Sequence, residues 1–343
     1  MIVKAQQLKY PEDSMASVYL LCTDPSPRDA SERLRESAAV DPFDVHSVVE
    51  DPVAANIILF AESWKSDVFM HQVISHPLTH KYPSKCYCCC ENAKSWPFLP
   101  GVYTGVDKWD HLTGRVRTGH YLWMYENNFV DKAPFAKANY LFSFVGNLDT
   151  YGIRSEIGKL THPRAFIRDT SEKSKSVWWD GTESEKARFR SQYSDDLARS
   201  KFVLCPRGIS PSSVRLFETM KTGRVPVIIS DDWVPPEGPQ WDSFSVKIKE
   251  SDIEQIPQRL DQAESRAPAM GARAREAWET WFSPTVSFHR IVEWCLSIEN
   301  TKHIPEPSGR VLALLQLGRP KYAMEVLRKC ATPLKEKLRG FLS

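Results

Sequence analysis

The residues best suited to chemistry stand together where an apolar segment passes into a helix-forming one. Ser212 and Ser213 precede Arg215, and Glu218 follows three residues later. Serine is favoured at the start of a helix, where free backbone N–H groups and the positive end of the helix dipole attract an anion. An arginine in the first turn opposes that dipole unless an anion covers the helix start. This spacing predicts a phosphate or diphosphate site.

Neighbouring residues extend the expected anion site toward a nucleotide. Glu218 shares a helical face with Arg215, so its carboxylate is placed to accept hydrogen bonds from two ribose hydroxyls. Arg207 adds a second positive charge, and Gly208 allows a tight turn before the helix. A simpler alternative is a surface ion pair between Arg215 and Glu218. The two interpretations differ in whether a ligand occupies the helix start.

The element that must position these residues is a strand, loop, helix and second strand over residues 201–233. Residues 202–205 are an apolar strand, residues 213–222 a helix that ends at Gly223, and residues 225–230 a second apolar strand. Parallel sheets bind ligands where their strands end. A dehydrogenase is disfavoured, because no strand leads into the Gly-x-Gly-x-x-Gly loop that binds a dinucleotide.

The rest of the chain repeats this alternation and predicts two α/β domains. Further short strands are expected at residues 17–22, 56–61, 85–90, 140–145 and 164–167, with helical stretches between them. We expect a Rossmann-like domain over residues 1–135, a second over 136–300, and a helical tail over 301–343. The two domains are expected to face each other across a cleft. Residues 96–128, rich in Gly, Pro and aromatic residues, are expected to form long loops over it.

Composition excludes several classes of function. Lys and Arg total 45 against 43 for Asp and Glu, so the net charge of +2 gives no reason to expect a nucleic acid partner. The longest apolar run, residues 57–61, is far too short to span a bilayer, and residues 1–10 lack the apolar core of a signal peptide. We therefore expect no transmembrane segment and a cytoplasmic location.

The eight cysteines are too few for a disulfide scaffold in a chain of this size. Cys86, Cys88, Cys89 and Cys90 are expected to fill a short buried strand as small hydrophobic residues. A zinc site is the disfavoured alternative, because the remaining cysteines stand alone in apolar segments. No cofactor is expected.

Five motifs lie between residues 140 and 260: FSFVGN followed by Arg154, then CPRG, SSVRLFE, GRVPVIISDDWVPP and FSVKIKESDI. This stretch resembles the C-terminal domain of exostosin-like glycosyltransferases. The resemblance implies a GT-B fold of two facing Rossmann-like domains. It also implies transfer of a sugar from a UDP- or GDP-linked donor to a glycan or other hydroxyl acceptor, with inversion, in polysaccharide or glycoconjugate biosynthesis. Matched residue by residue, Arg154 and Arg215 would meet the diphosphate and Glu218 the ribose.

The sequence also indicates whether a divalent metal is needed and which residues could act as the general base. It contains no Asp-x-Asp spacing, and the adjacent Asp231 and Asp232 project differently, so we expect no divalent cation. The leaving diphosphate would then be stabilised by Arg215, Arg154 and backbone N–H groups. Inversion needs a general base from the N-terminal domain. Glu62 and Glu91, each directly after an apolar strand, are the first candidates; Glu126, Asp110, His111 and His120 stay open as alternatives.

Two further interpretations remain. A fucosyltransferase-like GT-B enzyme would have a similar strand pattern, although its donor helix normally carries Lys at the position of Arg215. From a different class, the chain is a glycosyltransferase-like subunit without catalysis that docks onto an active partner. The resemblance also allows a dimer with itself or with a related chain.

Overall fold

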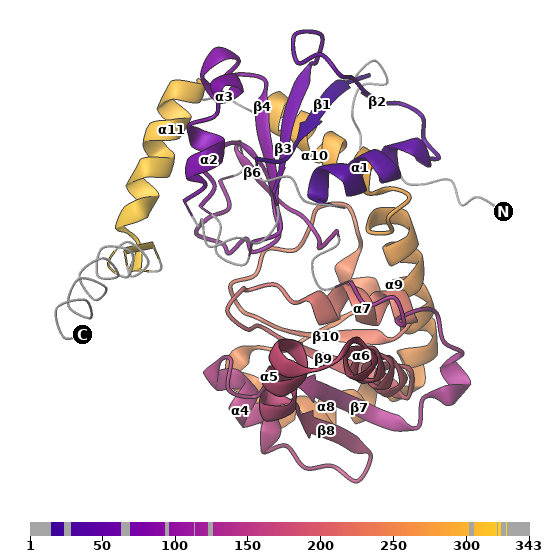
Figure 1. The fold of residues 1–343 in the computed structure, drawn as a ribbon. Coiled ribbons are helices and arrows are strands. Elements are labelled where there is room, and N and C mark those ends of the chain that lie inside the picture. The colour runs from indigo at the N-terminus through magenta and orange to yellow at the C-terminus, as the bar shows by residue number, and fades with distance from the viewer. Residues whose placement is uncertain are drawn as a thin grey trace.

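The computed structural model describes residues 15–23, 29–62, 69–92, 96–112, 114–122, 126–301, 305–320, 322–323 and 327. Two parallel sheets, one in each half of the chain, form the centres of two α/β domains that lie one above the other in Figure 1. The predicted fold class of two facing Rossmann-like domains is confirmed. The domain boundaries expected from the sequence stay a prediction.

The first sheet has the strand order β2-β1-β3-β4-β5-β6, and all its strand pairs are parallel. Its strands are β1 (Ser17–Leu21), β2 (Ser47–Val48), β3 (Ile57–Glu62), β4 (Cys86–Cys90), β5 (Gly101–Tyr103) and β6 (Val116–Thr118). Every residue of β3 and β4 is buried, as expected of central parallel strands covered on both faces. The strand predicted for the four crowded cysteines is confirmed as β4.

Three helices lie in the connections of the first sheet: α1 (Ala30–Ala39), α2 (His71–Ile74) and α3 (Pro77–Lys81). Helix α1 begins after Asp29, whose carboxylate accepts hydrogen bonds from the backbone N–H groups of Ser31 (2.8 Å) and Glu32 (3.1 Å). The strands β5 and β6 lie where the sequence analysis expected only loops. That expectation was wrong because each strand is three residues long, too short for a recognisable pattern.

The second sheet has the order β11-β10-β9-β7-β8, again with parallel pairs throughout. Its strands are β7 (Tyr140–Gly146), β8 (Ala165–Asp169), β9 (Ser200–Pro206), β10 (Val225–Ile229) and β11 (Val246–Lys247). In both sheets the second strand lies outside the first and the third follows on its other side. This order creates a switch point between β1 and β3, and another between β7 and β9.

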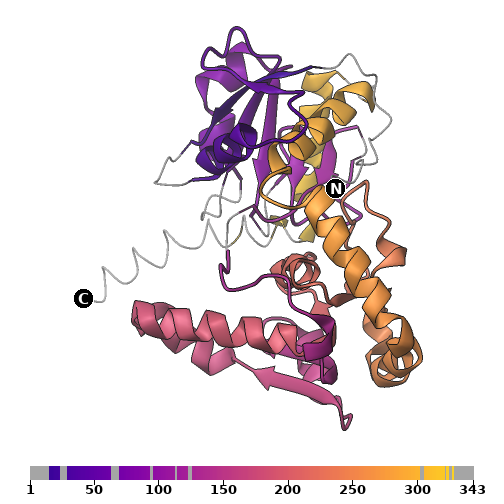
Figure 2. The ribbon, with the colours of Figure 1, turned by 90° about the vertical axis from the view of Figure 1, so that its right-hand side faces the viewer.

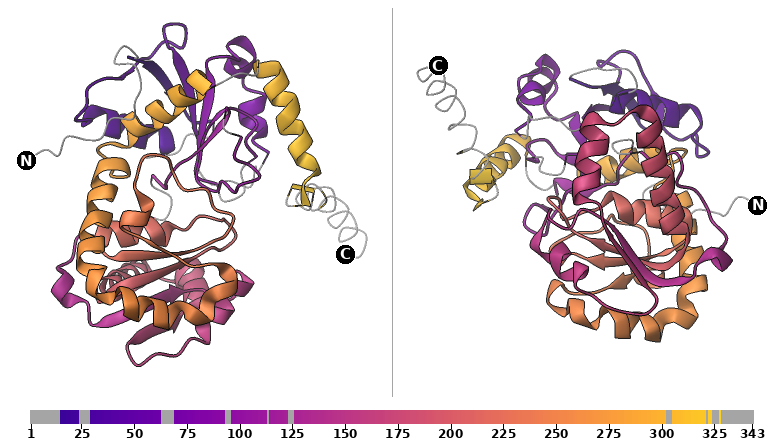
Figure 3. Two further views of the ribbon diagram at one scale, coloured as in Figure 1. Left: turned by 180° about the vertical axis from the view of Figure 1, so that it is seen from behind. Right: turned by 60° about the horizontal axis from the view of Figure 1, so that its bottom comes forward.

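Six α-helices belong to the second sheet: α4 (Gly152–Gly158), α5 (Ser171–Asp180), α6 (Glu183–Ala198), α7 (Val214–Thr222), α8 (Ile256–Ala263) and α9 (Ala267–Trp281). Helix α7 ends at Gly223, whose φ of 76° is the left-handed conformation that glycine adopts at helix ends. Helices α5 and α6 stand side by side as a hairpin in the right-hand view of Figure 3.

The chain returns to the first domain after α9. Helix α10 (Ser287–Thr301) packs against α1, β5 and β6, and Figure 2 shows α9 and α10 running from the lower domain to the upper one. Helix α11 (Glu306–Leu315) lies in the segment predicted as a helical tail and contacts the first domain, where Trp96 Nε1 donates to Ala313 O at 2.9 Å. None of the described helices is long and apolar enough to cross a membrane.

Candidate functional site

The strand order of the second sheet brings two arginines to its switch point. Arg154 lies on α4, which follows β7, and Arg215 lies on α7, which follows β9; β7 and β9 are neighbours in the sheet. Side chains after two adjacent parallel strands meet at the same edge of the sheet. The structure thus brings together two residues that are 61 positions apart in the sequence.

Both guanidinium groups lie against the same aromatic ring. The Cζ atom of Arg215 is 4.6 Å from the centroid of the Phe144 ring, and that of Arg154 is 5.9 Å from it. Phe144 is fully buried in β7. A cation above an aromatic face is held by the ring quadrupole, which fixes the position of a side chain that is otherwise flexible. Phe144 lies within the FSFVGN motif but was not predicted from the sequence as a site residue.

Arg154 is held by three backbone carbonyl groups. Its Nε donates to Arg207 O at 2.9 Å, Nη1 to Asn147 O at 3.3 Å and Nη2 to Pro206 O at 3.3 Å. Burial, together with the nearby charge of Arg215, lowers the pKa of Arg154 to about 9. A second cation so close makes the protonated pair unfavourable unless negative charge is added. The site therefore has an electrostatic need for an anion.

Arg215 has spare hydrogen-bonding capacity. Its Nη2 donates to Val145 O at 2.8 Å, whereas its buried Nε and Nη1 atoms have no hydrogen-bond partner among the described residues. Within those residues neither Arg215 nor Arg154 has a carboxylate within salt-bridge distance. A buried donor without a partner costs on the order of 1–3 kcal/mol, so an oxyanion at this position would recover that free energy. The surface ion pair of Arg215 and Glu218 is not formed.

Two glycines make room for the two arginines. A Cβ atom built on Gly146 would lie 2.4 Å from Nη2 of Arg215, and one built on Gly208 would lie 2.9 Å from Nη2 of Arg154. Gly208 was predicted to allow a tight turn. In the structure, its missing side chain leaves space for the guanidinium group of Arg154. Gly146 was not singled out from the sequence. Any larger residue at either position must displace a guanidinium group.

More polar atoms without partners surround the same edge of the sheet. The buried side-chain atoms Arg207 Nε, Ser212 Oγ and Ser230 Oγ have no partner among the described residues. Arg207 also stacks on Tyr151 at 4.6 Å and approaches Glu250 at 3.9 Å. Ser213 is the N-cap residue of α7, as predicted, but its side chain makes no capping hydrogen bond. Hydroxyl and guanidinium donors therefore converge on the start of α7.

Glu218 lies one turn further along α7. Its Oε2 accepts a hydrogen bond of 2.7 Å from the Tyr193 hydroxyl of α6, a partner that the sequence did not indicate. Burial raises the pKa of Glu218, while the Tyr193 hydrogen bond and the charge of Arg215 act in the opposite direction. The tyrosine fixes the orientation of the carboxylate without occupying its second oxygen.

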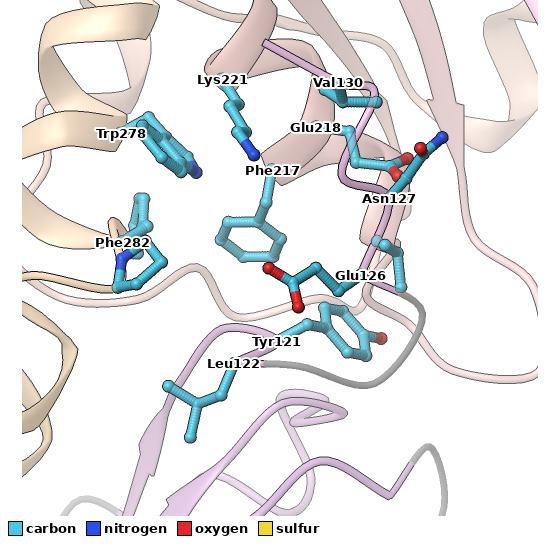
Figure 4. Close-up of a pocket in the computed structure, with 12 residues that line it drawn as sticks. Tyr121, Leu122, Glu126, Asn127, Val130, Phe217, Glu218, Lys221, Trp278 and Phe282 are labelled. Carbon is cyan, nitrogen blue, oxygen red and sulfur yellow. The ribbon is translucent and has the colours of Figure 1, made fainter. Parts of the chain in front are cut away.

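A pocket borders Glu218 where the two domains meet (Figure 4). It encloses about 530 Å³ of empty space, including the part open to solvent. Figure 4 shows the Phe217 ring near its centre, with Trp278 and Phe282 on one side and Asn127 and Glu218 on the other. The wall consists of Tyr121, Leu122, Glu126, Asn127 and Val130 before β7, Val214, Phe217, Glu218 and Lys221 of α7, and Trp278, Phe282 and Pro284 at the return to the first domain.

The two candidates for the general base are buried in the first domain. Glu62 ends β3 at the switch point of that sheet, where it accepts hydrogen bonds from Thr23 N at 2.9 Å and Thr23 Oγ1 at 3.1 Å. Glu91 follows β4, and its Oε1 accepts a hydrogen bond of 2.6 Å from the backbone N–H of Leu122. Because Leu122 lines the pocket, Glu91 is connected to it by one residue. Neither carboxylate is free of protein partners.

The other candidates are held in different ways. Glu126 lines the pocket and pairs with Arg33 at 2.8 Å. Asp110 binds Arg319. Burial lowers the pKa of His111, and lowers that of His120 to about 3. No group of three or more His, Cys, Asp or Glu side chains in the described part of the chain could hold a metal ion.

Comparison with known proteins places the donor-side residues within a recognised domain. Residues 122–263 match the exostosin GT47 domain. An exostosin-1 homolog of Caenorhabditis elegans is 32% identical over 154 residues, covering 41% of this chain and 40% of that protein. A probable glucuronosyltransferase of Oryza sativa subsp. japonica is 40% identical over 78 residues, covering 22% of this chain and 18% of that protein. The chain spans less than half the length of these relatives.

Structural comparison gives a weaker similarity. A solved glycosyltransferase from Rickettsia africae aligns over 84% of this chain and 99% of that chain, with a TM-score of 0.42 and 9% sequence identity. The fold is therefore established by the strand order and connectivity of the chain itself. Arg154, Arg207, Arg215 and Glu218 all lie within residues 122–263, and the resemblance predicted from their motifs is confirmed. Over residues 122–263 the chain is thus similar to the exostosin GT47 domain, the family that its motifs indicated.

Proposed function

We propose that the chain transfers a sugar from a nucleotide-sugar donor to a hydroxyl group of a glycan or other acceptor, with inversion at the anomeric carbon. The donor diphosphate lies over the start of α7, between Arg215 and Arg154, and the ribose hydroxyls donate to Glu218. The observation that carries this proposal is the pair of guanidinium groups on Phe144, one with two buried N–H donors that lack a partner. These groups suit an anion that arrives with the ligand.

We propose that the reaction proceeds without a divalent metal. As the glycosidic bond breaks, negative charge develops on the leaving diphosphate and must be stabilised at that place. Arg215, Arg154 and the N-terminal N–H groups of α7 supply positive charge and hydrogen bonds there. The measurement is turnover in the presence of excess chelator, which leaves the rate unchanged. A chelated enzyme that regains activity with added Mg²⁺ or Mn²⁺ contradicts this part of the proposal.

The donor is proposed to be a UDP- or GDP-linked sugar. Because a matched relative is named as a probable glucuronosyltransferase, UDP-glucuronic acid belongs in the first set of donors to be tested. The acceptor hydroxyl loses its proton to a carboxylate of the first domain. Glu91 is tested before Glu62 because it contacts a residue of the pocket wall. A carboxylate base gives a rate that rises with pH through its ionisation and then levels off.

The test of donor binding is a thermal shift screen with UDP, GDP and their sugar conjugates. Ligand at about one hundred times its Kd stabilises the folded protein by about 2.7 kcal/mol, so a true donor raises Tm measurably. Arg215→Ala should abolish most of that increase. The matched control is Arg188→Ala, an exposed arginine on α6 that is not assigned to the site, which should respond like the wild type. Equal responses of both variants to every nucleotide sugar would contradict the proposal.

A specific observation also favours the non-catalytic alternative. Both base candidates already accept hydrogen bonds from backbone N–H groups, Glu62 from Thr23 and Glu91 from Leu122. A subunit that binds a nucleotide sugar without turnover would show the Tm increase and no release of free nucleotide, with or without glycan acceptors. Nucleotide release that depends on Arg215 excludes this alternative. The cytoplasmic location and the dimer remain predictions.

A further inference from the structure

The hairpin of α5 and α6 exposes two adjacent tryptophans. Trp179 is 85% exposed and Trp178 is 43% exposed, both in the last turn of α5. Large aromatic side chains are normally among the most buried in a folded protein, and an exposed cluster of them usually marks a binding surface. Because successive helical residues point about 100° apart, the two rings face different directions. The cluster therefore offers two separate aromatic faces.

Capping hydrogen bonds fix the start of α6 at the tip of the hairpin, and two side chains support Trp178. Thr182 and Glu185 form a capping box at the start of α6: Thr182 N donates to Glu185 Oε2 at 2.8 Å, and Glu185 N donates to Thr182 Oγ1 at 3.3 Å. Trp178 packs edge-on against Phe189 with centroids 6.5 Å apart, and the Arg190 guanidinium lies 4.9 Å from its ring. The Trp179 side chain, in contrast, is exposed to solvent.

Arg190 connects the tryptophan pair with the pocket beside Glu218. Asn127, which lines the pocket, donates from Nδ2 to Arg190 O at 3.1 Å, and the side chain of the same Arg190 lies over Trp178. Three residues further along α6, about 4.5 Å by helical rise, Tyr193 holds Glu218. Arg190 therefore contacts a residue of the pocket wall through its backbone and Trp178 through its side chain.

We propose that Trp178 and Trp179 form an extended subsite for a polysaccharide acceptor, which leads from the pocket along the α5–α6 hairpin. This inference rests on the proposed function, because it assigns the acceptor class of the same site. The apolar C–H face of a pyranose ring stacks on the negative face of an indole. A chain of sugars that enters the pocket at one end would pass Arg190 and stack on the exposed ring of Trp179.

The surroundings of the two rings favour a glycan over a protein partner. Protein interfaces are depleted in Lys and Glu at their centres. The exposed residues near the tryptophans in the sequence include the charged Lys175, Asp180 and Glu183. Such groups suit the hydroxyls that project from the edge of a stacked sugar, because they donate and accept hydrogen bonds around its apolar face. A second copy of the chain would instead require a wider apolar surface.

The test is affinity electrophoresis of the full chain through native gels that contain a β-linked glucan, a xylan or hyaluronan, a polymer that contains glucuronic acid. At least one polymer should retard the wild type. Trp179→Ala should weaken that retardation about tenfold in apparent Kd, and Trp179→Phe, which keeps an aromatic face, should restore part of it. Trp109→Ala removes a tryptophan that is 64% exposed in the other domain and should migrate like the wild type.

The outcomes separate this inference from the proposed function. A Trp179→Ala variant that loses polymer binding but keeps the nucleotide-induced increase in Tm supports the subsite. The subsite is overturned if no polymer retards the wild type, if Trp109→Ala weakens binding equally, or if Trp179→Ala changes only the mass measured by light scattering, which would indicate self-association. Absence of any nucleotide-induced increase in the wild type instead defeats the proposed function, whatever the gels show.

Discussion

At the scale of single residues, the proposed donor site contains buried polar groups that lack hydrogen-bond partners among the described residues. Arg215 and Arg154 share the Phe144 ring, and two N–H groups of Arg215 are buried without partners among the described residues. The closeness of two like charges and the unpaired N–H groups are unfavourable in the free protein, and an oxyanion bound there would offset both. The N–H groups of the arginines are therefore in position before a ligand binds. This reduces the reorganisation of the protein that binding requires.

Gly146→Ala tests this positioning directly. The added Cβ would lie 2.4 Å from Arg215 Nη2, at the mobile end of a flexible side chain, so the arginine should move while the sheet stays intact. We expect a loss of nucleotide affinity of about tenfold, equivalent to about 1.4 kcal/mol, with a small change in Tm. Isothermal titration calorimetry measures the affinity. Gly152→Ala is the control, because no atom lies within 4 Å of its added Cβ; equal affinities for both variants would show that the space at Gly146 is unimportant.

At the scale of elements, the position of α7 depends on its close contact with α9. A Cβ on Gly271 of α9 would lie 2.5 Å from the carbonyl oxygen of Gly223, the residue that ends α7. Arg275, one turn further along α9, donates to Lys221 O. The C-terminal end of α7 is thus fixed against α9, and its N-terminal end is thereby directed at the edge of the sheet where the donor is proposed to bind.

Gly271→Ala should destabilise the protein by about 1–3 kcal/mol, because the atom it meets belongs to the backbone and cannot turn aside. The gain in helix propensity from alanine, up to about 1 kcal/mol, offsets part of this cost. Urea denaturation monitored by circular dichroism gives the free energy of unfolding. Gly318→Ala, where nothing lies within 4 Å of the added Cβ, is the matched control. A Gly271→Ala variant as stable as Gly318→Ala would mean that the two helices separate easily.

At the scale of the whole molecule, His120 lies in the core that joins the domains. Its ring is 6.1 Å from that of Phe217 on α7 and 5.3 Å from that of Phe282 after α9. Its Nε2 is 3.0 Å from Ser287 Oγ, and that hydroxyl already donates to Ser283 O. Nε2 must then be the donor, so the ring is neutral with its proton on Nε2. Protonation would bury a charge without a partner.

Lowering the pH should therefore reduce the free energy of unfolding, because His120 stays neutral in the folded protein and becomes protonated in the unfolded chain. The pKa of His120 is lowered to about 3 by burial, against an unfolded value near 6.5, so between these pH values the unfolded chain binds a proton that the folded one does not. Stability is fully present above pH 6.5 and falls by about 1.4 kcal/mol for each pH unit below it. His46, with its pKa lowered to about 4, adds to the slope.

The variant that checks this assignment is His120→Gln, which keeps a donor for Ser287 but does not titrate. Its free energy of unfolding, measured from pH 4 to pH 7, should depend less on pH than that of the wild type. His80→Gln, an exposed histidine on α3, should follow the wild type. Parallel pH profiles for the His120 variant and the wild type would contradict the role of His120.

The sequence predicted those features that depend only on neighbouring residues within one helix or strand. The start of α7, its end at Gly223 and the buried strand of cysteines were all predicted from local composition. Phe144 and Tyr193 could not be found in this way, because their partners Arg215 and Glu218 come from other elements that only the fold brings near. Helix α5 was missed because two exposed tryptophans at its end remove the apolar periodicity of an ordinary helix.

The return of the chain through α9 and α10 has a mechanical consequence. The backbone passes between the domains twice, once between β6 and β7 and once between α9 and α10, and the His120–Ser287 contact of 3.0 Å joins the two passages. Two adjacent connections define a line, and rotation about that line strains the backbone least. Contacts away from that line, such as the ion pair of Lys108 with Asp232 at 2.6 Å, must break before such a rotation can separate the domains. We therefore expect relative motion of the two domains to be a rotation about the line through these two connections.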